Sequence, residues 1–340
     1  HEPGATREKL ELQGVRVHLL RKRWRLDPIL WWSLRRLVVR ERFDAVLSML
    51  QGTNLHNLLV TPTVRGVACL ISYRGGTVYS WLARTEGRIA YRAQRLITPA
   101  ASVALDVVER YRIASSKVVH IPNGCDSSRF TPGDGQKQLE ARQQLGLPPD
   151  ALILYTPSRI DRTKGQDIMA AALALLQPLI SEKEVLWVNT GQCQDLALKR
   201  KIEGRVPPFA SRVRLLDATD RPEDWYAAAD IVVLPSRVEA FSNVLLESSF
   251  SGRLFVAAAV GETPEVAATI GGGIVYDGSS SDLAAKLTDL LNRPRRELIA
   301  EGLRLAGPAR NHYSLDHATR KFAETISDAV AERRAGMLVS

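Results

Sequence analysis

Asp230-Ile-Val-Val-Leu-Pro235 leads directly into Ser236-Arg-Val-Glu239-Ala-Phe241-Ser-Asn-Val-Leu-Leu-Glu247. The first segment predicts a short buried strand of a parallel sheet, because it is apolar, rich in β-branched residues and ends at a proline. The second predicts a loop and then a helix over residues 242–251. Open α/β sheets bind ligands at the carboxyl ends of their strands, so Glu239 is expected at a ligand-binding edge.

Glu239 and Glu247 are two carboxylates separated by seven residues. A carboxylate in the loop can accept hydrogen bonds from the hydroxyls of a sugar. One about two turns along the helix can reach a ribose diol, since a helix rises roughly 1.5 Å per residue. Such a pair also arises by chance in helical proteins, with Glu247 as a solvated helix residue. The interpretation as a sugar-nucleotide site therefore depends on the surrounding motifs.

Chain length and composition indicate two α/β domains: 340 residues with 45% apolar side chains can bury two cores of ordinary size. The sequence contains no apolar run of eighteen or more residues, so no transmembrane helix is predicted. Residues 1–4 do not resemble a signal peptide. Cys69, Cys125 and Cys193 form no metal-binding pattern and are expected to be buried, reduced thiols. We therefore expect a cytoplasmic protein, held peripherally at the inner membrane face if its basic region binds lipid.

A formal charge of +9 and a pI near 9.6 suit a polyanionic partner. Much of the excess lies in residues 16–42, where Trp24, Trp31 and Trp32 are interspersed among nine basic side chains. Basic and aromatic residues together are typical of a surface that meets anionic lipid. The alternative is a basic surface helix whose tryptophans pack into the core. A nucleic-acid partner is not expected, because no nucleic-acid-binding motif accompanies the charge. The nine residues are Arg16, Arg21, Lys22, Arg23, Arg25, Arg35, Arg36, Arg40 and Arg42.

Strand-like runs alternate with helical stretches, which predicts two doubly wound, Rossmann-like domains facing one another across a cleft. The expected first domain is residues 1–132, the second is 133–312, and residues 313–340 form a terminal helical segment. We interpret residues 131–150, rich in turn formers and charge, as the junction. The predicted strands are 14–20, 44–49, 67–73, 95–98 and 117–121 in the first half, and 152–156, 184–189, 213–216, 231–234, 254–257 and 273–276 in the second.

Two cations follow the strand predicted at 152–156. Arg159 and Lys164 lie in a turn that contains Gly165 and precedes a helical run from Ile168. An arginine fork, a lysine charge and a helix N-terminus together suit a diphosphate. The alternative is a basic loop neutralised by its own aspartates. The glutamate pair on a later strand of the same half favours the diphosphate.

With these motifs in view, the chain resembles the retaining glycosyltransferases of family four, which have the GT-B fold. The resemblance covers nearly the whole chain, and its motifs occur in the expected order. It is specific for the family and poorly specific for the substrate. The motifs are Ser158-Arg159-(four residues)-Lys164-Gly165, Pro235-Ser236-(two residues)-Glu239-Ala-Phe241-(five residues)-Glu247, Gly261-Glu-Thr-Pro264-Glu265 and Ile121-Pro-Asn-Gly124-Cys-Asp126-Ser-Ser-Arg-Phe130-Thr-Pro132.

The resemblance implies a metal-independent enzyme of the hexosyltransferase class that moves a sugar, with retention, from a nucleotide-sugar donor to a glycan or lipid-linked acceptor. Arg159 and Lys164 would clamp the diphosphate and stabilise the leaving group, and Glu247 would bind the ribose. Glu239 would hold the donor sugar and orient it without acting as an acid or base. The donor-binding set would be completed by Phe241, Ser242, Asn243 and Val244, and no cofactor is expected. The resemblance also implies that the terminal helical segment, residues 313–340, crosses back to the first domain.

The chain departs from the family pattern at two places. The usual opening strand and Gly-rich loop have no match here, so we expect a first domain that lacks them. Where relatives often carry a histidine near the reacting carbon, this chain has Arg74, which cannot accept a proton and can only stabilise negative charge. Arg74 joins Arg159, Lys164 and Glu239 as a predicted catalytic residue, although it could equally be an ordinary loop cation. These departures leave an alternative: a nucleotide-sugar-binding protein with little or no turnover.

Overall fold

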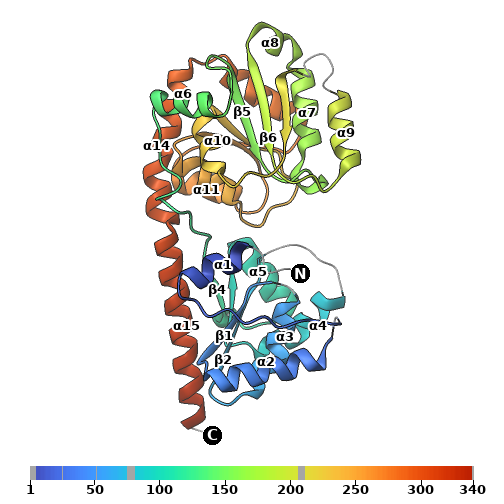
Figure 1. Ribbon diagram of the computed structural model, residues 1–340, viewed down its shortest axis with the longest axis vertical. Helices are drawn as coiled ribbons and strands as arrows, with labels where there is room; N and C mark the ends of the chain where they lie inside the picture. Colours follow the sequence, from blue (N-terminus) through green and yellow to red (C-terminus); the bar gives the residue numbers. More distant parts are fainter. Residues whose placement is uncertain (1–4, 25, 51, 75–80, 206–210, 339–340) are drawn as a thin grey trace.

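Two parallel sheets organise the computed structural model, which describes residues 5–24, 26–50, 52–74, 81–205 and 211–338 (Figure 1). The first sheet has the order β1-β2-β3-β4, and the second has the order β10-β9-β8-β5-β6-β7. Every pair of neighbouring strands is parallel. The carboxyl ends of all strands in a sheet therefore meet at one edge of each domain.

The first domain contains α1 (Ala5–Leu12), α2 (Pro28–Glu41), β1 (Ala45–Ser48), α3 (Thr53–Val60), η1 (Thr61–Thr63), β2 (Ala68–Ser72), α4 (Trp81–Ile89), η2 (Ala90–Arg92), β3 (Arg95–Thr98), α5 (Ala101–Tyr111), η3 (Ser115–Lys117) and β4 (Val118–His120). Four of its five predicted strands are confirmed. The strand predicted over residues 14–20 is wrong: the segment has no regular structure. Its apolar side chains Val15, Leu19 and Leu20 are exposed, so its periodicity did not reflect a buried face.

The second domain contains α6 (Gly135–Gln144), β5 (Leu152–Pro157), η4 (Arg162–Lys164), α7 (Gln166–Leu175), α8 (Gln177–Glu182), β6 (Val185–Thr190), α9 (Leu196–Arg205), β7 (Val213–Leu216), α10 (Pro222–Ala228), β8 (Ile231–Leu234), α11 (Asn243–Phe250), β9 (Leu254–Ala258), α12 (Thr263–Ile270), β10 (Ile274–Tyr276), α13 (Ser280–Leu291) and α14 (Arg295–Tyr313). All six predicted strands are present. The stretch interpreted as a junction contains α6, which packs against α10 of this domain. Every residue of β8 and β9 is buried, because helices cover both faces of the sheet.

A terminal helix ties the two domains together. Helix α15 (Leu315–Leu338) continues α14 along one side of both lobes and packs on β1 and β2 (Figure 1). Where the chain passes between the domains, Cys125 pairs with Ser314, and Cys125 N–H donates to the Tyr313 carbonyl. A side chain at Gly124 would meet the Leu315 Cα at 2.6 Å, so only glycine permits this crossing.

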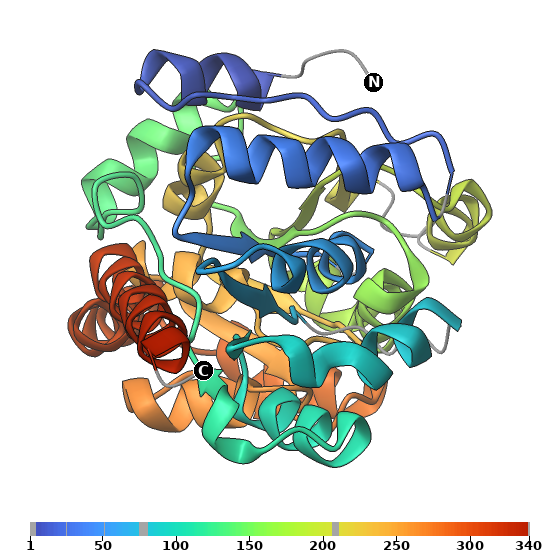
Figure 2. The same cartoon turned by 90° about the horizontal axis from the view of Figure 1, so that it is seen from below.

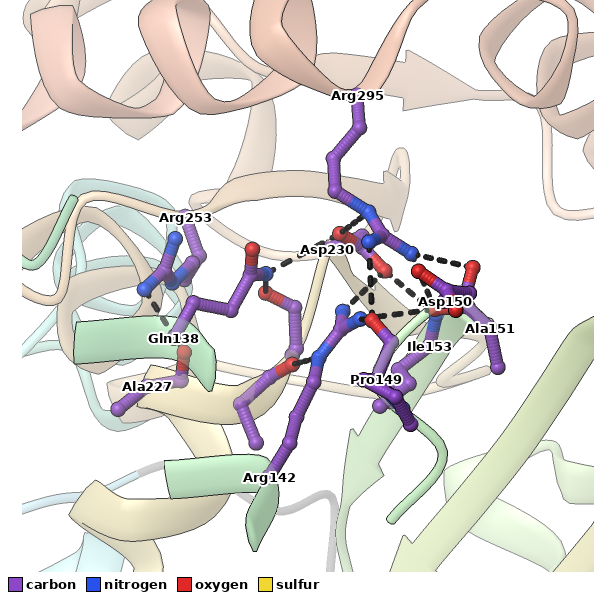
Figure 3. Close-up of polar contacts among 12 residues, drawn as sticks. Gln138, Arg142, Pro149, Asp150, Ala151, Ile153, Ala227, Asp230, Arg253 and Arg295 are labelled. Carbon is purple, nitrogen blue, oxygen red and sulfur yellow. Dashed lines mark hydrogen bonds and ion pairs between the residues drawn. The ribbon is translucent and has the colours of Figure 1, made fainter. Parts of the chain in front are cut away.

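A buried ionic cluster fixes α6 and α14 to the amino-terminal ends of β5 and β8 (Figure 3). The Asp230 carboxylate accepts from Arg142 Nη2 at 2.7 Å and from the Ile153 N–H at 2.7 Å. Arg295 Nε lies 3.1 Å from the same carboxylate. Arg253 lies close by, and burial lowers its pKa to about 10. The buried Asp230 carboxylate is thus the counter-ion of more than one guanidinium group. Loss of its charge would leave these arginines uncompensated.

The basic, tryptophan-rich region resolves into an extended segment and α2 at the outside of the first domain (Figure 2). Trp31 is half-buried and donates its Nε1–H to His56 Nδ1 at 2.8 Å. This tryptophan therefore fits the alternative in which the tryptophans pack into the core. Trp24 and Trp32, by contrast, are 60% and 61% exposed. Arg25 lies outside the described residues. No helix within the described part of the chain is long and apolar enough to cross a membrane.

Candidate functional site

A cavity of about 240 Å³ opens at the carboxyl ends of β5 and β8. It brings together four of the residues that the sequence singled out: Arg159, Lys164, Glu239 and Val244. Its walls come from two loops that follow neighbouring strands and from the start of α11. The lining residues are Thr156, Pro157, Ser158, Arg159, Lys164, Val233, Leu234, Pro235, Ser236, Glu239 and Val244.

Lys164 and Glu239 are in direct contact inside this cavity. Lys164 Nζ donates to Glu239 Oε1 at 2.6 Å, and Ser236 Oγ donates to the same oxygen at 2.8 Å. The two charged side chains are 22% and 14% exposed, so they are reachable from solvent but well shielded. The second oxygen of Glu239 makes no hydrogen bond within the described residues and can accept from a ligand hydroxyl.

Arg159 lies at the mouth of the cavity. Its Nη1 donates to Gln194 Oε1 at 3.0 Å, and its Nη2 is 3.6 Å from Asp161 Oδ2. The side chain remains 52% exposed. Neutralisation of this loop by its own aspartates is therefore partial. Asp161 is 3.6 Å from Arg159, whereas Asp167 binds Arg237. Arg237 lies in the loop between β8 and α11 that carries Glu239, called the glutamate loop below.

Arg237 is a site-supporting residue that sequence reasoning missed. Its guanidinium binds Asp167 through two hydrogen bonds of 2.8 and 2.9 Å, and its backbone N–H donates to the Thr163 carbonyl. The glutamate loop is thus fastened to the Lys164 loop. Gly165 allows the same approach, because a Cβ at its φ of 68° would overlap the Pro235 carbonyl oxygen. The sequence indicates this role only through the position of Arg237, two residues before the predicted site residue Glu239.

The first turn of α11 lies at the cavity, which Val244 lines. The N–H groups of this turn have no partner within the helix, and Ser242, the N-cap, makes no side-chain hydrogen bond to them. A helix N-terminus of this kind favours an anion. Phe241 lies just before it, with its ring 5.9 Å from that of Tyr313. These backbone groups complement the positive charge of Lys164 and Arg159.

Glu247 lies one turn beyond Val244 on α11 and is not among the residues that line the cavity. Its Oε2 accepts from the hydroxyl of the fully buried Tyr226 at 2.7 Å. Burial raises the pKa of Glu247, while the Tyr226 hydroxyl and the charge of Arg129 oppose that rise. The residue is therefore a shielded carboxylate with a fixed orientation and is not a freely solvated helix residue.

Arg74 is also separate from the cavity lining and lies two residues after β2 in the first domain. Its Nη1 donates to Asn123 Oδ1 at 2.8 Å, and Asn123 Nδ2 donates to Asn243 Oδ1 at 2.7 Å. A second polar contact also joins the domains, because the Ser102 N–H donates to Glu262 Oε1 at 3.0 Å. The predicted site residues of both domains are thus connected through Asn123, which lies in a family motif but was not predicted as a site residue.

A metal centre is not evident in the described ranges: no three histidine, cysteine, aspartate or glutamate side chains there are grouped so as to hold an ion. The described cysteines are free thiols. Burial raises the pKa values of Cys69 and Cys125 to about 12, so both stay protonated at neutral pH. Cys193, which was expected to be buried, is half-exposed.

Two family models match this chain. "Glycosyltransferase Family 4" matches residues 2–129, and "Glycosyl transferases group 1" matches residues 151–293. Together they cover both α/β domains.

Curated relatives include proteins named D-inositol 3-phosphate glycosyltransferase. The one from Actinosynnema mirum is 34% identical over 259 residues, covering 72% of this chain and 60% of that protein. Another, from Catenulispora acidiphila, is 34% identical over 222 residues, covering 62% of this chain and 51% of its own length. The chain therefore spans about half the length of the curated relatives it matches.

Solved structures share the fold at low identity. A glycosyltransferase from Rickettsia africae superposes with a TM-score of 0.81 at 16% identity, covering 96% of this chain and 88% of that one. The Anabaena protein HepE, solved in complex with UDP and glucose, also gives 0.81, at 19% identity and with 95% and 89% coverage. The predicted GT-B architecture of two facing parallel-sheet domains is confirmed, while the absence of an opening strand and Gly-rich loop stays a prediction.

Proposed function

Because the chain belongs to the glycosyltransferase family that these two models describe, we propose that it transfers a sugar from a nucleotide-sugar donor to a glycan or lipid-linked acceptor. The observation that carries the proposal is the contact between Lys164 and Glu239 in a cavity that Arg159 also lines. Cations and a polyol-binding carboxylate side by side suit a phosphate bonded directly to a sugar.

The diphosphate is the part of the donor that gains charge when the glycosidic bond breaks. Arg159 and Lys164 supply positive charge, and the free N–H groups at the start of α11 supply oriented dipoles. Preorganised charges of this kind stabilise a leaving group without rearranging during the reaction. The proposed catalytic contribution of the second domain is therefore electrostatic.

Glu239 and Glu247 orient the donor in this proposal. Lys164 and Ser236 hold one oxygen of Glu239, which leaves the other for a sugar hydroxyl. Glu247, fixed by Tyr226, accepts from the ribose. The bond from the anomeric carbon to the phosphate oxygen breaks, the acceptor oxygen bonds to the same face of that carbon, and the acceptor proton passes to the departing phosphate. This sequence retains the anomeric configuration, which ¹H NMR of the first product formed can check.

Turnover is the direct test of the function. UDP-glucose, GDP-mannose and ADP-glucose are supplied in turn with a bacterial membrane lipid extract, and released nucleoside diphosphate is measured. We expect release with at least one donor, increased by the extract and undiminished by EDTA, because the proposed site uses side-chain cations in place of a metal. Tight binding of UDP, GDP or ADP without turnover of any donor would support the binding-only alternative.

We also propose that the outer face of α2 lies on an anionic membrane, where a lipid-linked acceptor would be found. This face consists of Ile29, Trp32, Arg36 and Val39, which recur at helical spacing and are all exposed. The Arg36 guanidinium lies 5.3 Å above the Trp32 ring. Apolar side chains flanked by arginines match a headgroup layer in both polarity and charge.

Vesicle flotation tests this second proposal. Vesicles of phosphatidylcholine with phosphatidylglycerol should carry the protein at low salt and release it as salt rises. Trp32→Ser should weaken this binding, whereas Leu105→Ser, which removes an equally exposed apolar side chain from α5, should not. Equal flotation of both variants, or none by the unmodified protein, would contradict the membrane assignment.

A further inference from the structure

Arg74 carries a charge that no carboxylate compensates within the described part of the chain. Within the described residues, its hydrogen-bond partner is the side-chain amide of Asn123, which is neutral. A neutral acceptor fixes the direction of a guanidinium while leaving its positive charge available to another anion. Lys164 differs in this respect, since Glu239 already neutralises it.

Asn123 directly precedes the point where the chain packs against Ser314 and Leu315. The next residue, Gly124, lies against Ser314 and Leu315, where a Cβ would be 2.6 Å from the Leu315 Cα. Cys125 is paired with Ser314 through backbone hydrogen bonds on both sides. The Asn123 side chain is therefore presented from a backbone that the domain crossing holds in place.

The other partner of Asn123 belongs to the donor site. Asn243 is the first residue of α11 and directly precedes Val244, which lines the cavity. Asn123 Nδ2 donates to Asn243 Oδ1 at 2.7 Å, so one amide side chain binds the Arg74 guanidinium and the start of α11 at once. The charge of the first domain is thereby held beside the anion-binding end of a second-domain helix.

We propose that Asn123 is a positioning residue that holds Arg74 of the first domain, with its charge uncompensated, against the donor site of the second domain. The inference rests on the proposed function and adds a group to it: the guanidinium stabilises the negative charge that grows on the diphosphate as the sugar leaves. Within the described residues Arg74 is linked to the second domain through Asn123, so its contribution requires the contact between Asn123 and Asn243 to be in place.

Asn123→Asp and Asn123→Ala separate this role from a merely structural one. Aspartate keeps an acceptor for Arg74, and the Asn243 amide can rotate so that its Nδ2 donates to the new carboxylate. The domains stay linked, but the Arg74 charge is now neutralised. Alanine removes both hydrogen bonds. A structural role requires the hydrogen bonds alone, whereas the proposed role requires the uncompensated charge as well.

The measurement uses the full chain and the donor that it turns over among UDP-glucose, GDP-mannose and ADP-glucose. We expect kcat to fall by at least about tenfold in both variants, as when one preorganised electrostatic contact is lost. The KM for the donor should change less than about threefold, since an interaction made mainly in the transition state affects kcat more than KM. Asn292→Asp, an exposed asparagine at the end of α13, is the matched control and should match the unmodified protein.

A double-mutant cycle with Arg74→Ala completes the test. If Asn123 acts through Arg74, adding Asn123→Asp to Arg74→Ala should lower kcat by less than about twofold, because residues that act as a unit are not additive. Full activity of Asn123→Asp together with loss in Asn123→Ala would overturn the proposal and leave a structural tie. That result is distinct from failure of the proposed function, in which the unmodified protein releases no nucleoside diphosphate from any donor.

Discussion

Lys164 Nζ lies 2.6 Å from Glu239 Oε1, although the two residues are 75 positions apart in the chain. The contact exists because Gly165 and Arg237 bring the loop after β5 against the loop after β8. It places a cation and a carboxylate at adjacent points of one cavity, as a sugar bonded to a phosphate requires. The carboxylate also reduces the charge that Lys164 offers to a phosphate.

Glu239→Gln should therefore separate sugar binding from phosphate binding. Without the carboxylate, the Lys164 charge is fully available, so affinity for UDP, GDP or ADP should be retained or increase. Turnover of the matching nucleotide sugar should fall at least about tenfold, because a hydrogen bond from a sugar hydroxyl to a charged acceptor is lost. Calorimetry and the diphosphate-release assay measure the two effects.

The matched control for Glu239 is Glu265→Gln, which changes an exposed glutamate in the first turn of α12. It should leave both affinity and turnover unchanged. A parallel loss of nucleoside diphosphate affinity and turnover in Glu239→Gln would show instead that Glu239 supports the phosphate site as a whole.

Glu247→Gln should remove the preference for an intact ribose. The unmodified protein is expected to bind UDP at least about tenfold more tightly than its 2′,3′-dideoxy analogue, since a buried carboxylate left without hydroxyl donors is costly. The affinities of the variant for UDP and for the dideoxy analogue should differ by less than about twofold. If GDP or ADP binds the protein better than UDP, that nucleotide and its dideoxy analogue are used in place of UDP. A lower melting temperature with an unchanged preference would assign Glu247 to the core beside Tyr226.

The sequence was most informative where local pattern and tertiary structure coincide. Ten of the predicted strands are present and are mostly buried or half-buried, and their helical connections are typical of a parallel arrangement. Residues 14–20 show the limit of that reasoning, because an alternating pattern predicts a strand only when another strand is available to pair with it. Arg159, Lys164 and Glu239 could be grouped because each follows a strand of the same sheet.

Contacts between distant segments could not be predicted in this way. Nothing near Asn123 in the sequence indicates that its amide joins Arg74 to Asn243, since the partners are 49 and 120 positions away. Likewise, Asp230 looked like an ordinary residue before a strand, yet it is the anion of a buried cluster. Side-chain pairing across domains depends on how the sheets face one another, which hydrophobic periodicity does not encode.

Asp230→Asn should strongly destabilise the protein. The substitution leaves Arg142 and Arg295 without their buried counter-ion, and breaking such a pair costs about 3–5 kcal/mol. Urea unfolding measures the loss. Glu11→Gln, which breaks the exposed pair with Arg7, is the control and should change the free energy of unfolding by less than about 0.5 kcal/mol. A loss below about 1 kcal/mol for Asp230→Asn would show that water compensates the arginines.

Glu86 should make stability fall as pH rises from about 4.5 to about 7. Its carboxyl group is fully buried, and burial raises its pKa from 4.5 to about 7, against the hydrogen bond from Asn54. The native state therefore keeps a proton that the unfolded chain releases in this window. The stability associated with that proton is complete below the unfolded pKa and is lost as pH passes through the folded pKa.

Glu86→Gln replaces the protonated carboxyl with a neutral amide of the same shape. Relative to the unmodified protein, it should gain roughly 3 kcal/mol of stability at pH 8 and almost nothing at pH 4.5. Urea titrations at both pH values measure the difference, with Glu8→Gln on the exposed surface of α1 as a control. An equal effect of Glu86→Gln at the two pH values would mean that Glu86 titrates normally.

Lys164 is proposed to bind the phosphates of a nucleotide, and the affinity of Lys164→Ala for a nucleoside diphosphate measures that contact. Calorimetry with UDP, GDP and ADP in turn compares this variant with Arg162→Ala, which removes a neighbouring, highly exposed cation outside the cavity lining. Loss of a charge-assisted contact worth about 1.5–3 kcal/mol should weaken binding at least about tenfold in Lys164→Ala and leave Arg162→Ala unchanged. Equal affinity of the unmodified protein and Lys164→Ala would show that Lys164 does not bind the phosphates.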